Sequence, residues 1–403
     1  MPWVSNQSMG DQSSIVSDFY DRFPYPGDPL IDEPPRGFNW RWCLDNVYAF
    51  CTGALPLKIG SRKRFRILDA GCGSGVSTDY LAHLNPGSEI LAVDISKGTL
   101  SVALERLRRS GGKDKAELHF KNINILNMKS EGLFDYINSV GVIHHLSDPL
   151  EGLKTLTKHL KNGGILHLFV YAEGGRWEIG RIQKALKNMR VSNDKNDIQL
   201  SRSLLQNLPK NNRLRRNHEE KWLIDSQSDV NFADMYLHPR ETTFNIETLF
   251  QLIEDSNLEF LGFSNPNIWS LGRLLKGDLL DRVNVMTPMQ KFQLVEILDP
   301  DISHFELFLS KGPLKHYQWG NDDDLLATTG KISRSICGQP SQVFYDYEFN
   351  RIELTKNCLK LIEVIEKEPT KPLGLLPLGW HKSLIASTAR DLTSRQLLLL
   401  YPP

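Results

Sequence analysis

Between Phe65 and Tyr171 the sequence alternates short apolar runs with helical patterns, and this alternation restricts the possible folds more than any other feature. The apolar runs lie at residues 65–70, 89–94, 116–121, 134–139 and 164–171, and the helical patterns lie near 74–84, 97–109 and 149–161. Buried strands that alternate with helices predict an α/β fold, in which right-handed crossovers connect the strands of a parallel sheet.

The same pattern resumes after residue 243. We expect a helix at 246–257, a strand at 258–263, a helical insertion, and a final strand at 304–310. The final strand is parallel if a short crossover precedes it and antiparallel if the insertion lets the chain turn back. The residues are compatible with both arrangements.

The flanking segments have a different composition. Residues 1–60 are rich in aromatic residues and proline, which favours extended or turn geometry, and we expect them to form a lid. The central domain is expected at 61–315, with a helical insertion at about 174–243. Residues 320–403 are expected to form a small C-terminal appendage, helical or similar to a winged helix, because Leu354, Cys358, Leu361, Ile362 and Ile365 share one helix face.

The overall charge is balanced, since 48 Lys and Arg residues equal 48 Asp and Glu residues. This balance gives no whole-protein attraction to nucleic acid or to an anionic membrane, and we expect neither partner. No apolar run reaches the ~18–20 residues that span a bilayer. The odd set of cysteines contains no C-x-x-C pair and indicates reduced thiols, and the N-terminus lacks a signal-peptide pattern, so we expect a cytoplasmic protein. The cysteines are Cys43, Cys51, Cys72, Cys337 and Cys358.

Residues 181–221 carry eleven Lys and Arg against four Asp and Glu. A basic docking surface is one interpretation of this stretch. The other, which we favour, is a solvated face of the helical insertion.

A glycine-rich turn follows the first predicted strand, with glycines at positions 71, 73 and 75. Glycine permits positive φ and lets a ligand approach the backbone closely. Position 76 is Val, so the G-x-G-x-x-G pattern of dinucleotide-binding turns is absent, which argues against a nicotinamide dehydrogenase. A tight turn without a ligand remains the alternative for the glycines taken alone.

Polar residues or glycine follow the next three strands as well. Asp94 ends the second strand and can accept the hydroxyls of a ribose; its alternative role is to cap the next helix. Asn124 follows the third strand, where it could meet an adenine amine, and Gly141 follows the fourth. Because the carboxyl ends of parallel strands share one edge, these groups predict one nucleotide-type crevice.

Residues 68–75, 92–95, 134–146 and 160–164 resemble class I S-adenosylmethionine (SAM)-dependent methyltransferases. They are most similar to the small-molecule group, of methyltransferase type 11 or 12, that includes enzymes of ubiquinone and menaquinone biosynthesis. The resemblance implies a Rossmann-like, seven-stranded, mostly parallel sheet with an antiparallel last strand and helices on both faces. It also implies SAM as cofactor and methyl transfer to a small-molecule acceptor.

The resemblance assigns cofactor-binding roles along the strand ends. The family commonly has Asp where Asn124 stands, although an Asn oxygen can accept the same hydrogen bond. The cofactor-binding residues it implies are Asp69, Gly71, Cys72, Gly73, Ser74, Gly75, Asp94, Ile95, Asn124, Ile125, Val140 and Gly141.

Other residues are candidates for the chemistry and for the acceptor. His144, and after it His145, could act as a general base, although a histidine at this place more commonly packs at a helix start. Tyr20 and Tyr25 could close over the sulfonium, or only pack against the core. The acceptor could contact Tyr171, Arg176 and His238, and no metal is expected.

Two further segments, residues 20–26 and 233–239, are similar to segments that flank methyltransferase domains in some bacterial proteins. This looser resemblance concerns domain architecture rather than substrate. Two other functions stay open: a SAM-binding regulatory or scaffold protein without turnover, and a methyltransferase that acts on protein or RNA.

Overall fold

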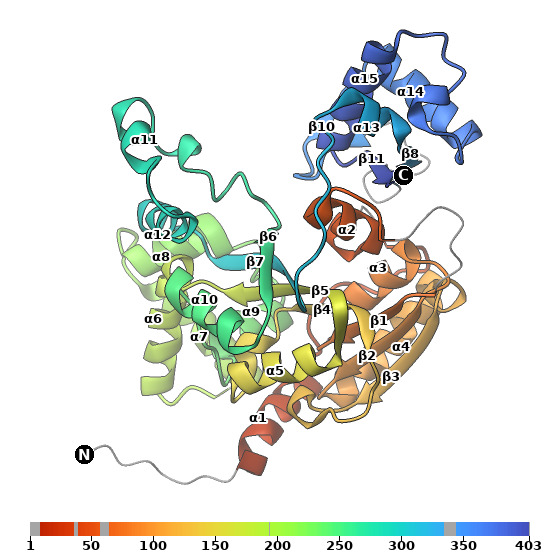
Figure 1. The fold of residues 1–403 in the computed structure, drawn as a ribbon. Helices are drawn as coiled ribbons and strands as arrows, with labels where there is room; N and C mark the ends of the chain where they lie inside the picture. The colour runs from red at the N-terminus through yellow and green to blue at the C-terminus, as the bar shows by residue number, and fades with distance from the viewer. Residues whose placement is uncertain (1–8, 36–38, 57–63, 193, 334–343, 403) are drawn as a thin grey trace.

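A seven-stranded sheet forms the centre of the protein. The computed structural model describes residues 9–35, 39–56, 64–192, 194–333 and 344–402. The strand order is β3-β2-β1-β4-β5-β7-β6, and β7 runs antiparallel to both of its neighbours (Figure 1). This confirms the α/β class. Of the two arrangements considered for the final strand, the antiparallel one is correct and the parallel one is wrong. The strands are β1 (Arg66–Ala70), β2 (Glu89–Asp94), β3 (Glu117–Asn122), β4 (Phe134–Val140), β5 (Leu160–Tyr171), β6 (Glu259–Phe263) and β7 (His304–Ser310).

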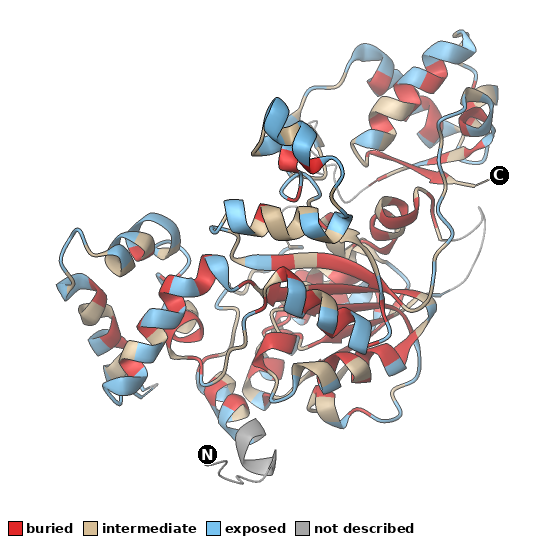
Figure 2. Ribbon diagram, turned by 60° about the vertical axis from the view of Figure 1, so that its left-hand side comes forward, coloured by how far each residue is buried: buried red, intermediate tan, exposed pale blue. Residues whose placement is uncertain are grey.

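Helices cover both faces of this sheet because successive strand residues point to opposite sides. Ile67 of β1 packs in one apolar cluster with α2 and α3, whereas its neighbour Leu68 packs in another with α5, α10 and α12. In Figure 2 the buried residues are concentrated in the sheet and on the helix sides that face it. These helices are α2 (Leu44–Thr52), α3 (Val76–Leu84), α4 (Lys97–Ser110), α5 (Pro149–His159), α10 (Ile246–Asp255) and α12 (Pro288–Leu298). Helix α11 (Asp278–Val283) projects away from the sheet (Figure 1).

The observed bounds differ from the predicted ones by at most two residues, except at the start of β5. We expected a turn before residue 164, but β5 already begins at Leu160. Leu160 pairs with Phe134 of β4, and a register shift then brings Ile165 opposite Tyr136, so residues 161–164 have no partner in β4.

The N-terminal segment contains two helices, α1 (Met9–Arg22) and α2, where we predicted extended or turn geometry. That prediction was wrong for these stretches because the prolines lie between the helices, at positions 24 to 35, and not inside them. Phe19 of α1 and Phe23, directly after this helix, pack in one apolar cluster with the insertion. The insertion is helical, as expected, with α6 (Trp177–Asn188), α7 (Lys195–Asn207), α8 (Arg213–Asn217) and α9 (Asp229–Leu237).

The last part of the chain forms a small unit of helices and two-stranded sheets. Strand β8 pairs antiparallel with β11, and the predicted apolar helix face belongs to α14. Leu361 and Ile365 of α14 share an apolar cluster with Leu44 and Val47 of α2. The elements of this unit are α13 (Asp322–Ala327), β8 (Thr329–Ile332), β9 (Phe344–Tyr345), β10 (Arg351–Ile352), α14 (Lys356–Lys367), α15 (Lys382–Ser394) and β11 (Leu398–Tyr401).

Two compositional expectations bear on this fold. Cys43, Cys51, Cys72 and Cys358 are free and buried, whereas Cys337 lies outside the described residues. Among the helices of the described part, none combines the length and the apolar character that crossing a bilayer requires.

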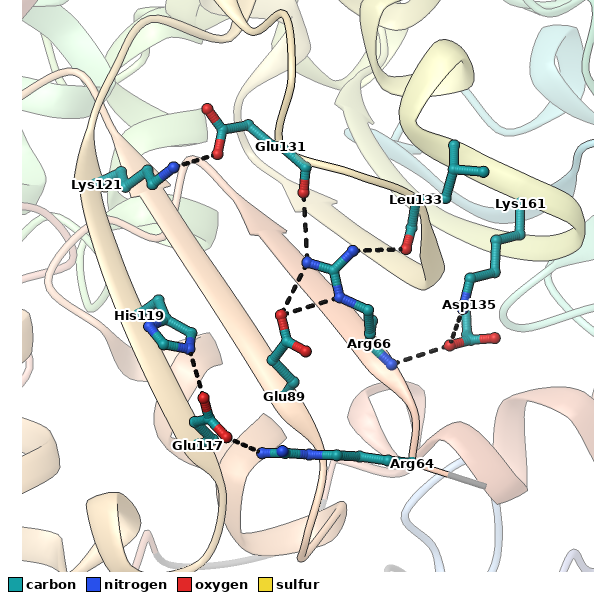
Figure 3. A network of polar contacts seen from close by, with 10 residues as sticks. All are labelled: Arg64, Arg66, Glu89, Glu117, His119, Lys121, Glu131, Leu133, Asp135 and Lys161. Carbon is teal, nitrogen blue, oxygen red and sulfur yellow. Dashed lines mark hydrogen bonds and ion pairs between the residues drawn. The ribbon is translucent and has the colours of Figure 1, made fainter. Parts of the chain in front are cut away.

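Charged side chains pair near the amino ends of the strands, at the edge away from the glycine turn (Figure 3). Arg66 at the start of β1 binds Glu89 at the start of β2, with Nε 2.9 Å from Oε1. Asp135 of β4 accepts hydrogen bonds from the Arg66 N–H at 2.9 Å and from Lys161 Nζ at 2.8 Å. These contacts tie β1, β2, β4 and β5 together at one end.

Phe308 tests how far the core depends on the antiparallel strand. Its ring is fully buried and lies 5.8 Å from the ring of Trp40 and 5.1 Å from that of His167. We expect Phe308→Ala to lower the free energy of unfolding by about 3–5 kcal/mol, because the cavity cannot fully collapse. Urea unfolding measures this, with the half-exposed Leu104→Ala as control, for which we expect less than about 0.5 kcal/mol. Equal effects for both variants would contradict the proposed core.

Candidate functional site

A cavity of about 320 Å³ lies at the carboxyl edge of β1, β2, β4 and β5 and is covered by the N-terminal segment. Ligand sites commonly have volumes of roughly 300–1,000 Å³. The structure brings most of the predicted site residues to this cavity. Those that line it are Tyr20, Tyr25, Gly71, Cys72, Gly73, Asp94, Ile95, Asn124, Ile125, Val140, Gly141, His145 and Tyr171. In the described part of the chain, the remaining predicted residues do not line it: Asp69, Ser74, Gly75, His144, Arg176 and His238.

The glycine turn is in direct contact with the N-terminal segment. A Cβ on Gly73, which has φ +54°, would lie 2.5 Å from the Tyr25 carbonyl oxygen. Ser74 donates its N–H to that oxygen at 2.8 Å and its hydroxyl to the Pro26 carbonyl at 2.7 Å. The glycine at position 73 therefore serves the close approach of the cover, in addition to forming the turn.

Asp69 lies beneath the turn rather than in the cavity wall. Its buried carboxylate accepts hydrogen bonds from Ser77 at 2.7 Å, Thr78 at 2.6 Å and Asn138 at 2.8 Å. Burial raises the pKa of Asp69, and the three donors oppose that shift. These contacts hold the start of α3 against β1 and β4 and so position the turn.

Asp94 holds the turn and lines the cavity at the same time. Its two carboxylate oxygens accept the N–H groups of Gly73 and Ser96, each at 2.9 Å. The cap of α4 is Ser96, so the capping role considered for Asp94 is taken by its neighbour. Burial raises the pKa of Asp94 to about 6. A carboxylate has about four acceptor positions. The Ile95 backbone also hydrogen-bonds to Asp94, so at least one position remains for a ligand hydroxyl.

Asn124 and Gly141 form other parts of the wall. The Asn124 side chain accepts the Leu126 N–H at 3.0 Å and caps the short helix η3 (Ile125–Asn127). Gly141 has φ +77°, and a Cβ placed on it would meet no described atom within 4 Å. The backbone at Gly141 is therefore open to close approach by a ligand.

The two segments that resemble flanking sequences come together beside the cavity. The Tyr20 hydroxyl donates to Asp234 Oδ1 at 3.0 Å, and the His145 and His238 rings lie 3.8 Å apart. Burial raises the pKa of Asp234 to about 7 and lowers that of His145 to about 4. We did not single out Asp234, although the resemblance of residues 233–239 to flanking segments was a signal for it.

Arg176 and His144 have other surroundings than we expected. The Arg176 guanidinium forms two hydrogen bonds with Glu241, at 2.9 and 2.8 Å, and lies 3.4 Å from the centre of the Tyr171 ring. His144 is fully buried, and neither of its ring nitrogens has a hydrogen-bond partner in the described structure. Between the two histidines, only His145 faces the cavity.

Comparisons with known proteins fit this geometry. A family profile described as a methyltransferase domain matches residues 68–166. An uncharacterized protein of Synechococcus sp. (strain ATCC 27144 / PCC 6301 / SAUG 1402/1) is 44% identical over 396 residues, which cover 97% of this chain and 94% of that protein. A ubiquinone biosynthesis O-methyltransferase of Ruegeria pomeroyi is 29% identical over 126 residues, or 30% of this chain and 48% of that enzyme.

The solved structure of PKMT2 from Rickettsia typhi is similar in fold. It superposes with a TM-score of 0.61 at 19% identity, covering 92% of this chain and 77% of that one. The chain contains a class I SAM-dependent methyltransferase domain. In this methyltransferase, the profile covers the glycine turn, Asp94, Asn124 and Gly141. It does not reach the N-terminal cover or Asp234.

The contact between the cover and the turn can be tested at Gly73. We expect Gly73→Ala to lower the free energy of unfolding by roughly 3 kcal/mol, since its Cβ adds a backbone clash to the strain of positive φ. Gly87→Ala is the matched control: Gly87 has φ +79°, but its Cβ would meet no described atom within 4 Å. For this control we expect only the strain of ~1–2 kcal/mol. Urea unfolding compares the two, and equal losses would contradict the contact.

Proposed function

We propose that the cavity binds SAM along the carboxyl edge of the sheet and transfers its methyl group to a small-molecule acceptor. Asp94 would accept the ribose hydroxyls, and Ile95, Asn124 and Ile125 would surround the adenine. The methionine part would lie along Gly71, Cys72 and Gly73, opposite Val140 and Gly141. The observation that carries this proposal is that all of these residues line one cavity, although they follow three separate strands and the turn after β1.

Asp69, Ser74 and Gly75 have a supporting role in this proposal. Asp69 accepts a hydrogen bond from Thr78 of α3, and Ser74 donates one to the Pro26 carbonyl of the cover. A Cβ on Gly75 would lie 2.8 Å from Ala103 of α4, so this glycine allows α3 and α4 to pack. These three residues would therefore affect cofactor binding indirectly, by fixing the conformation of the glycine turn.

The reaction itself is an in-line displacement. The acceptor's lone pair forms a bond to the methyl carbon while the carbon–sulfur bond breaks, and the sulfur keeps its electron pair as S-adenosylhomocysteine. Holding the three atoms in line supplies a large part of the rate enhancement, up to ~7–11 kcal/mol for well-oriented reactions. A protonated acceptor must also lose a proton, and His145 is placed to take it because it faces the cavity and is uncharged at neutral pH.

The acceptor end has the features of a site for a small molecule. Tyr20, Tyr25, Tyr171 and Asp234 enclose it under the N-terminal cover. An aromatic wall of this kind also suits the positive sulfonium. Arg176 and His238 support this wall, since Arg176 lies over the Tyr171 ring and His238 contacts the rings of Tyr20 and His145.

The basic stretch at 181–221 favours a solvated surface over an RNA-binding one. Arg202, Arg213, Arg215 and Lys221 are each in an ion pair with a carboxylate. Arg213 also lies over the Trp177 ring, 4.7 Å from its centre. Basic groups that are already paired contribute less to phosphate binding.

The ribose contact is tested by titration with S-adenosylhomocysteine. We expect the wild-type protein to bind it and Asp94→Asn to bind it roughly 10–100-fold more weakly, because hydrogen bonds to a charged group are lost. Isothermal calorimetry measures the affinity, circular dichroism checks the fold, and the exposed Asp255→Asn serves as control. Undiminished affinity in Asp94→Asn would overturn the assigned contact. Absence of binding by the wild type would overturn the cofactor site.

The same contact predicts a pH dependence. Ribose hydroxyls donate best to the carboxylate form of Asp94, whose pKa is about 6. Protonation therefore competes with binding, and the affinity for S-adenosylhomocysteine should be constant above about pH 7 and fall by up to ~10-fold per pH unit below 6. In Asp94→Asn this component of the profile should vanish. A wild-type affinity unchanged between pH 7 and 5 would argue against the carboxylate.

Turnover separates an enzyme from a regulatory SAM-binding protein. We expect a small molecule from a cell extract to acquire an isotopically labelled methyl group from SAM when the wild-type protein is added. Mass spectrometry of the extract with and without protein detects the product. Label that appears only in protein or RNA would favour a macromolecular acceptor, and binding without any labelled product in extracts would favour the regulatory function.

A further inference from the structure

Three side chains of the kind that bind metals meet at the acceptor end of the cavity. His145 lies in the short helix η4 (Ile143–His145) after β4, Asp234 lies in α9, and His238 directly follows α9. One potential ligand atom from each residue lies within 4.8 Å of the other two, and all three residues are buried. Positions 234 and 238 are four residues apart, which places both side chains on the same side of the helix end.

The remaining contacts of these side chains leave coordinating atoms available. His145 Nδ1 is 2.8 Å from the Arg240 carbonyl, which accepts its proton and leaves the Nε2 lone pair free to coordinate. Tyr20 donates to only one oxygen of Asp234. His238 Nε2 is buried and has no hydrogen-bond partner among the described residues. A ring N–H that donates to a backbone carbonyl is a frequent second contact of metal-binding histidines.

Two arginines lie near these three side chains, Arg176 and Arg240. The charge of Arg176 is paired with Glu241, and Asp234 supplies a carboxylate for a cation. An uncharged imidazole and a carboxylate are the protonation states that bind metals.

One contact must change when a metal binds. The Arg240 N–H approaches His238 Nδ1 at 3.1 Å, which places the ring proton on Nε2. Coordination through Nε2 moves this proton to Nδ1. The hydrogen bond from the Arg240 N–H to Nδ1 must therefore break when the metal binds.

We propose that His145, Asp234 and His238 bind one divalent first-row transition-metal ion. Two imidazoles and one carboxylate form a three-ligand set that leaves further coordination positions open. Because His145 and Asp234 line the cavity, these positions face the acceptor and would bind an acceptor oxygen. Metal binding itself does not depend on the proposed function, whereas its use in orienting the acceptor does. This proposed metal site replaces our expectation that the protein binds no metal. In it, His145 is a metal ligand and not the general base.

Titration of the chelator-treated full-length protein with Co²⁺ and Zn²⁺ tests the site. We expect one ion per chain, with visible ligand-field absorption for Co²⁺ and heat of binding for Zn²⁺. Asp234→Asn and His238→Gln should each weaken binding at least 10-fold, because each removes one of three ligands. His119→Gln is the matched control, since His119 is a half-exposed histidine beside the carboxylate of Glu117, with Nε2 3.0 Å from Oε1. It should bind as the wild type does.

A wild type without saturable binding, or variants that bind like the wild type, would overturn the site. If the variants fail to fold, X-ray absorption of the Zn²⁺-loaded wild type decides instead. Two imidazoles in a nitrogen and oxygen shell support the site, and a sulfur-containing or purely oxygen shell excludes it. S-adenosylhomocysteine titration of the metal-free protein separates the two proposals, because it tests the cofactor site whether or not a metal binds.

Discussion

The packing of the Tyr25 carbonyl against Gly73 is the contact on which the rest of the site depends. No side chain fits between them, so the glycine turn and the N-terminal cover fix each other's position. Arg106 of α4 reinforces the contact from behind, donating to the carbonyls of Ser74 at 2.9 Å, Pro29 at 3.0 Å and Asp28 at 2.8 Å. Because these acceptors are backbone carbonyls, the buried Arg106 guanidinium fixes the main chain of the turn and of the cover. The floor and the cover of the cavity therefore form one structural unit.

A buried polar chain links this unit to the middle of the sheet. Asn138 of β4 donates to Asp69 of β1 and has its side-chain oxygen 3.0 Å from His167 Nδ1 of β5. His167 in turn contacts Glu306 of β7 at 3.1 Å, and Arg41 pairs with the same carboxylate at 2.7 Å. Burial alone would raise the pKa of Glu306, but His167 and Arg41 outweigh it and lower the pKa to about 2. Such a network fits only one register of the four strands, because a shift of one residue would leave buried polar groups unpaired.

The sequence predicted the sheet and the half of the site that the sheet forms, for a specific physical reason. Parallel strands bring their carboxyl ends to one edge, so Gly71, Asp94, Asn124 and Gly141 could be placed together from their positions along the chain alone. Helix α1 was missed because the nearby prolines dominated the local pattern. The sequence also could not predict which of His144 and His145 faces the cavity. This depends on the conformation of the single helical turn that contains both residues. The pairing of Arg176 with Glu241 joins positions 65 residues apart, and no periodicity reports such a contact.

The two halves of the cavity thus differ in how the chain makes them. The proposed cofactor half comes from consecutive strand ends within residues 68–166, the part that the family profile matches. The proposed acceptor half contains His145 from that part, but its other residues lie outside it: Tyr20 and Tyr25 precede it, and Tyr171, Asp234 and Arg240 follow it. Substitutions in the acceptor half leave the strand ends unchanged, so acceptor preference can differ between relatives that share the cofactor site. Family membership therefore determines the cofactor, whereas the acceptor must be inferred from the segments that only the folded chain brings together.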